Sequence, residues 1–213
     1  VDRNNISYPI HFIGWGNGQN APHAYLMIPF IALLGLSISV IRLPMLLSGI
    51  ATLPFIYLIF KRTVDEKFGL FAMFCIAISP WHILLSRWGL ESNLLPFAFT
   101  VGYFFLLKTR DDWRWFIPAN ILFAVCLYIY GTTYAFLPIF IFFAAGILLW
   151  SGTLKIRQVI IGLLILVGLG LPIILFVLIN IFGLNSIHIG PITIPNMPTL
   201  SRFQGEGAMF QSD

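Results

Sequence analysis

Residues 39–62 decide the fold and read SVIRLPMLLSGIATLPFIYLIFKR. An apolar run of about 20 residues is long enough to cross a lipid bilayer as one helix. This run ends on two basic residues, Lys61 and Arg62. The whole chain has the same character, because 59% of its residues are hydrophobic, 9% are charged and the mean hydropathy is +0.92. A soluble domain carries about a quarter charged residues, so the sequence predicts an integral membrane protein.

Further apolar runs continue along the chain and predict an all-α, polytopic transmembrane helical bundle of about six spans. The run from 115 to 154 is too long for one crossing, and Gly131-Thr132-Thr133 near its middle predicts a hairpin of two helices. In the last run, Gly162, Gly168 and Gly170 are expected to permit close helix packing. The predicted spans are 39–60, 68–85, 94–107, 116–130, 134–150 and 159–182.

The lysine and arginine residues predict the orientation. Most of them fall in three loops on one side of the predicted bundle, which the positive-inside rule assigns to the cytoplasm. These residues are Lys61, Arg62, Lys67, Lys108, Arg110, Arg114, Lys155 and Arg157. The prediction is a multi-pass cell-membrane protein with residues 1–38, the segment 79–93 and the tail 183–213 outside the cytoplasm. No long run or face is basic, so the net charge of +4 does not indicate a nucleic-acid partner.

The two outer segments differ from the spanning module at 39–182. Residues 1–38 form a turn-rich loop that contains an apolar helix starting at Pro22, too short to span and suited to the interface, with Gly35 at its end. The tail 183–213 is rich in proline, glycine and asparagine, and residues 187–195 could form an extended segment. Two isolated cysteines, Cys75 and Cys126, are expected to be free thiols.

The most informative stretch for function lies between two apolar runs and reads WHILLSRWGLESN over residues 81–93. Charge near the end of a membrane span is costly unless it meets a ligand, a partner charge or water. Arg87 and Glu91 are four residues apart, so on a helix they would share a face and could pair. A ligand site and a self-satisfied ion pair both remain open. No His-x-x-x-His or similar spacing supports a metal site.

Several short motifs, taken in order, resemble one family of membrane enzymes. They include Asn20-Ala21-Pro22-His23-Ala24-Tyr25-Leu26, Arg42-Leu43-Pro44, Lys61-Arg62, Ser79-Pro80-Trp81-His82, Ser86-Arg87 and Glu91. Together they resemble the GT-C glycosyltransferases that use polyprenyl-phosphate sugars, nearest the protein mannosyltransferase-like and aminoarabinose-transferase-like group. The resemblance covers nearly the whole chain.

The resemblance implies inverting transfer of a sugar from a polyprenyl-phosphate donor to an acceptor glycan, lipid or protein on the extracytoplasmic face. It implies no cofactor, although a divalent metal stays open. In this family the usual catalytic acid follows the first helix, and no position here matches it. The chain is therefore expected to be a fragment that lacks the first helix, the catalytic acid and the C-terminal part, and to be inactive alone.

Candidate site residues follow from the polar cluster and the resemblance. Glu91 is a supporting candidate for catalysis, and the expected substrate-binding residues are Arg87, Glu91, His82, Arg42, Trp15, Asn20 and Tyr130. Each has a structural alternative: His82 bonded to backbone, Trp15 and Tyr130 in the aromatic belt, and Arg42 extended toward the headgroups. A transporter, or a flippase or ligase of lipid-linked sugars, is the alternative function.

Overall fold

The computed structural model describes residues 9–13, 18–189 and 192–196. The chain divides into two compact units, residues 22–170 and a second unit made of 1–21 with 171–213. Helices make up most of the described chain, which confirms an all-α membrane fold. Among the described helices, α2 (Ile38–Thr63), α7 (Thr133–Trp150) and α8 (Ile156–Phe182) are each long and apolar enough to span a membrane.

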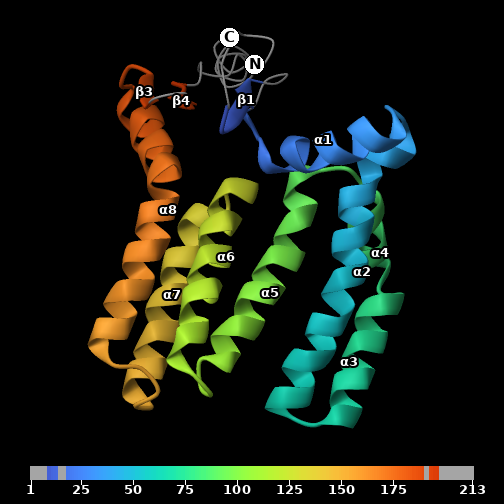
Figure 1. Cartoon of the computed structure of the whole chain (residues 1–213), viewed down its shortest axis with the longest axis vertical. Helices are drawn as coiled ribbons and strands as arrows, with labels where there is room; N and C mark the ends of the chain where they lie inside the picture. The colour runs from blue at the N-terminus through green and yellow to red at the C-terminus, as the bar shows by residue number, and fades with distance from the viewer. Residues whose placement is uncertain (1–8, 14–17, 190–191, 197–213) are drawn as a thin grey trace, which may run out of the picture. The chain divides into compact units, whose positions relative to one another are not determined.

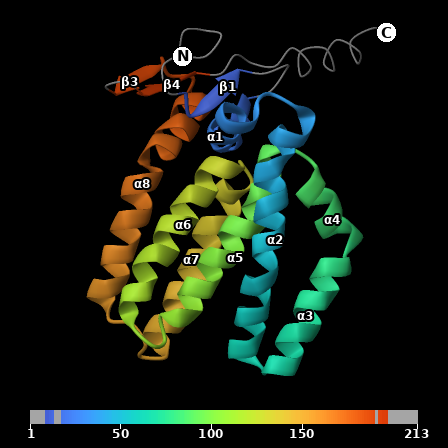
Figure 2. The same ribbon diagram turned by 45° about the vertical axis from the view of Figure 1, so that its right-hand side comes forward.

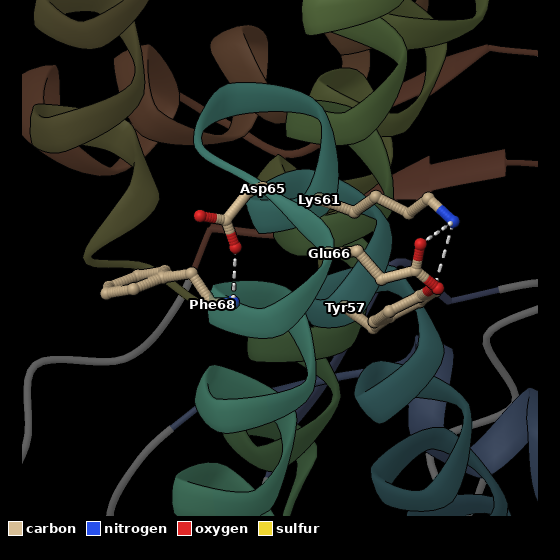
Figure 3. Close-up of polar contacts among 5 residues, drawn as sticks. All are labelled: Tyr57, Lys61, Asp65, Glu66 and Phe68. Carbon is tan, nitrogen blue, oxygen red and sulfur yellow. Dashed lines mark hydrogen bonds and ion pairs between the residues drawn. The ribbon is translucent and has the colours of Figure 1, made fainter.

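The turn between α2 and α3 (Glu66–Ile78) is built from charged and polar side chains (Figure 3). Asp65 caps α3 by accepting a hydrogen bond from the backbone N–H of Phe68 at 2.7 Å. Lys61 lies 3.3 Å from a carboxylate oxygen of Glu66 and donates to the Tyr57 hydroxyl at 3.0 Å. These contacts explain why α2 and α3 run side by side in Figures 1 and 2.

The predicted second span, 68–85, is wrong as one unbroken helix. α3 ends at Ile78, α4 (Pro80–Arg87) begins two residues later, and the two helices are bent by 60°. Proline has no N–H to donate and disfavours the helical conformation in the residue before it. Ser79 accordingly has extended backbone angles, φ −65° and ψ 120°. If the bent pair is one span, it is a fourth candidate, so the predicted count of six is not established.

The next helices are α5 (Leu95–Lys108) and α6 (Phe116–Ile129), which pack along each other and are joined by a loop with a short 3-10 turn. Both are shorter than 18 residues. The predicted hairpin at 131–133 is confirmed between α6 and α7, where the Thr133 hydroxyl donates to the Tyr130 carbonyl at 2.6 Å.

Two of the three glycines expected to aid packing leave room on α8 for side chains of α6. A Cβ on Gly162 would overlap the Phe116 ring and lie 2.8 Å from the Asn120 amide nitrogen, and one on Gly170 would lie 2.9 Å from Leu127. Gly168 was expected to serve the same purpose, but a Cβ there would meet nothing within 4 Å. Small residues therefore matter at the two positions that face α6.

The expected short helix is α1 (Pro22–Leu34), and Gly35 ends it with a left-handed φ of +77°. The second unit contains two antiparallel hairpins. One pairs β3 (Ile187–Ile189) with β4 (Ile192–Ile194), where an extended segment was expected. The other pairs β1 (His11–Ile13) with β2 (Gly18–Asn20), and this hairpin was not predicted from the sequence.

Candidate functional site

The polar segment 79–93 folds as α4, a short loop and the 3-10 turn η1 (Glu91–Leu94). Asn93 holds it together. Its buried side-chain amide donates to the carbonyls of Leu85 at 3.0 Å and Trp88 at 2.8 Å, in addition to the backbone N–H groups of Trp88 and Leu90 that these carbonyls also accept. Sequence reasoning missed this role, and the one available signal is a polar residue directly before the apolar start of α5.

α4 lies directly against α2 because Gly49 has no side chain. A Cβ on Gly49 would collide with the Ser86 hydroxyl and lie 2.7 Å from the Ser86 Cβ. One turn away, His82 places Nε2 3.2 Å from the Gly49 carbonyl. Because a carbonyl accepts hydrogen bonds, this contact requires the proton on Nε2. His82 thus joins two helices, which matches the backbone-bonded alternative for this residue.

Arg87 and Glu91 do not share a helix, so the expected i, i+4 arrangement is wrong. α4 ends at Arg87 because Trp88 is extended, and Glu91 begins η1. Asn93 ties the two segments together across this break through its bonds to the carbonyls of Leu85 and Trp88. Arg87 is exposed, whereas Glu91 is half-buried in a turn that contacts α1, α2, α5 and α6.

An apolar core packs against η1. It brings together Met45 from α2, Leu94 from η1, Ala98 from α5, and Cys126 and Ile129 from α6. Interiors are packed closely enough that a change of one methylene in such a cluster is felt by its neighbours. The turn η1, which begins at Glu91, is therefore held by a close-packed cluster at this end of the 22–170 unit.

The start of α1 also reaches this loop. His23 is buried, and its ring hydrogen-bonds to the backbone carbonyl of Ile41. A Cβ on Gly89 would lie 3.5 Å from the His23 Cε1 atom. Burial lowers the pKa of His23 below its usual value, and the contact to Ile41 opposes this. Arg42, the next residue on α2, is exposed. This end thus combines Arg42, Arg87, Glu91 and His23.

The remaining predicted residues lie elsewhere. Tyr130 is exposed at the end of α6, where its carbonyl accepts from Thr133. Asn20 belongs to the other unit, where it is buried and pairs across the β1–β2 hairpin with His11. Trp15 lies outside the described residues. Within the described ranges, no group of three or more His, Cys, Asp or Glu side chains is arranged to hold a metal ion.

A family model described as dolichyl-phosphate-mannose-protein mannosyltransferase matches residues 20–180, which include α1 to α7, most of α8 and the segment 79–93. The chain belongs to this family. It is therefore a multi-pass membrane protein of the GT-C glycosyltransferase type, and membership does not favour the transporter alternative. Neither the curated proteins nor the solved structures contain a match to this chain.

Proposed function

We propose that this end of the 22–170 unit binds the phosphate–sugar head of a polyprenyl-phosphate donor, from which the sugar is transferred to an acceptor on the extracytoplasmic face of the cell membrane. The observation that carries the proposal is Arg87. It stands at the end of α4, exposed and, within the described part of the chain, without an ion pair or hydrogen bond from its side chain.

The guanidinium group suits this task. It presents several donors in a planar fork that matches two phosphate oxygens, and it keeps its charge at any physiological pH. Arg42, exposed near the start of α2, adds a second positive charge on this end. The aliphatic tail of the donor would remain among the apolar helix surfaces in lipid. Membrane lipid and an acceptor glycan, lipid or protein are the other proposed partners.

The proposed reaction moves one sugar and one proton. An acceptor hydroxyl oxygen attacks the anomeric carbon, the bond from that carbon to the phosphate oxygen breaks, and the phosphate leaves with the electron pair. The hydroxyl proton goes to a carboxylate base. Positive groups placed where the leaving phosphate gains charge supply a large share of such catalysis. Arg87 takes this role, Glu91 orients the acceptor, and no cofactor beyond the lipid-linked sugar is required.

Arg87→Ala in the full-length protein tests the proposal. We expect transfer from polyprenyl-phosphate mannose to fall by about 100-fold, because one electrostatic donor to a developing anion contributes roughly that much. Arg87→Lys should recover part of it, since a lysine keeps the charge and loses the fork. Arg110→Ala is the matched control, because Arg110 is another exposed arginine that follows the end of α5. Equal transfer by Arg87→Ala and Arg110→Ala would remove Arg87 from the site.

A further inference from the structure

His23 has an unusual environment for a buried histidine. The residue is 8% exposed in the first turn of α1, and its Nε2 atom is buried with no hydrogen-bond partner within the described chain. Buried polar atoms in proteins nearly always have a partner, so each exception needs an explanation. His23 also borders the loop between Arg87 and Glu91, since Gly89 lies against its ring.

The contact to Ile41 fixes the tautomer of His23. A backbone carbonyl accepts hydrogen bonds, so the ring nitrogen that faces Ile41 must carry a proton. That nitrogen is Nδ1, because Nε2 has no partner. With the proton on Nδ1 and the ring neutral, Nε2 presents a lone pair. Burial favours this neutral form, because it lowers the pKa of the ring.

We propose that Nε2 of His23 accepts a hydrogen bond from an alcohol hydroxyl that the bound substrates bring to this site. The proposal rests on the proposed function, whose substrates carry hydroxyls on the sugar of the donor and on the acceptor. A lone pair repels the anionic oxygens of a phosphate, so His23 and Arg87 are expected to bind different parts of one donor. Arg87 binds the phosphate and His23 recognises the sugar or the hydroxyl that attacks it.

Two substitutions separate this role from a structural one. The side-chain amide of Asn reaches the position of Nδ1, so His23→Asn keeps the contact to Ile41 and removes the group at Nε2. The longer Gln places its amide near Nε2, so His23→Gln keeps a hydrogen-bonding group there and loses the contact to Ile41. The binding role predicts a defect in His23→Asn, whereas a purely structural role predicts a defect in His23→Gln.

The experiment measures binding of two lipids to the full-length protein in nanodiscs, polyprenyl-phosphate mannose and the same polyprenyl phosphate without sugar. We expect His23→Asn to bind the mannose lipid about tenfold more weakly, the loss expected for one hydrogen bond. It should bind the sugar-free lipid as the wild type does. His23→Gln should stay within about twofold of the wild type for both lipids, by the same reasoning. A thermal unfolding midpoint close to that of the wild type shows that each variant is folded.

The transfer assay then identifies the source of the hydroxyl. Weaker binding of the mannose lipid by His23→Asn assigns the hydroxyl to the sugar. Unchanged lipid binding with a raised KM for the acceptor assigns it to the acceptor, and either result supports the proposal. Wild-type binding and wild-type KM values in His23→Asn overturn it and leave a buried water as the partner of Nε2. A wild-type protein that binds neither lipid would instead overturn the proposed function.

Discussion

The two ends of the 22–170 unit differ in the ion pairs that their charged side chains form. At the end with the α2–α3 turn and the α5–α6 loop, two ion pairs form, Lys61 with Glu66 and Arg62 with Asp111, alongside charges such as Arg110 that have none within the described chain. At the other end, within the described chain, the side chains of Arg42 and Arg87 make neither ion pairs nor hydrogen bonds.

At the end with the α2–α3 turn, part of the charge has a structural role. Paired charges near the surface fix the ends of helices, although each pair contributes little to stability because water screens it. Lys108 belongs to the same group, since its ammonium lies 4.0 Å from the centre of the Trp115 ring. An arginine without a partner beside a rigid loop has no such structural task. The lack of ion pairs around Arg42 and Arg87, within the described chain, supports the proposal that the α4–η1 end is the binding end.

Gly49→Val should have the largest effect, because it disrupts the contact between α2 and α4 that positions the binding end. The new side chain would collide with Ser86, so α4 must move away from α2. Overpacking of this kind costs about 1–3 kcal/mol or more. We expect a lower thermal midpoint and the loss of donor binding. The double variant Gly49→Ala with Ser86→Gly removes the colliding groups and should be more stable than Gly49→Ala alone. If it is not, the α2–α4 contact is not what limits stability.

Asn93→Leu should have an intermediate effect, confined to the binding end. It keeps a similar volume but removes the two hydrogen bonds by which the buried Asn93 amide ties η1 to the end of α4. A cost of about 1–3 kcal/mol is expected. Hydrogen exchange should rise at residues 85–91, while the α2–α3 turn stays protected. Ser92→Ala is the matched control, since Ser92 makes one long contact at 3.4 Å. Faster exchange at both ends would show that the ends are coupled.

Asp111→Asn should have the smallest effect, at the end with the α2–α3 turn and the α5–α6 loop. The Arg62 guanidinium lowers the pKa of Asp111 below its usual value. The unfolded chain therefore binds more protons as the pH falls, so the contribution of Asp111 is present at neutral pH and is lost below about pH 4. The variant should unfold at a slightly lower temperature than the wild type at pH 7, and the difference should shrink as the pH is lowered to 3. A large difference at pH 7 would contradict the view that these pairs contribute little.

The sequence predicted the helices well because their ends carry strong local signals. Lys61 and Arg62 close α2, Gly35 ends α1, and Gly131 to Thr133 separate α6 from α7. The break at Ser79 was missed although Pro80 was visible, because apolar residues continue on both sides and hydropathy does not register a bend.

The site was harder to predict because it depends on contacts between distant segments. The pairing of Arg87 with Glu91 assumed a continuous helix, and Asn93 ends that helix through carbonyls five and eight residues earlier. The environment of His23 requires Ile41 and Gly89, from two other segments of the chain. No local pattern contains that information. The roles proposed for Arg87, Glu91, Arg42, Asn20, Trp15 and Tyr130 stay predictions.

The bend at Ser79 also bears on the thickness of the surrounding bilayer. At 1.5 Å per residue, the 13 residues of α3 rise by about 20 Å and the eight of α4 by about 12 Å. Tilted by 60°, α4 adds only about 6 Å along the axis of α3, giving a total of about 26 Å. The hydrocarbon layer is about 30 Å thick. If the pair is one span, we expect the bilayer to thin around it, and this would bring the headgroups, with a lipid phosphate among them, toward the depth of Arg87.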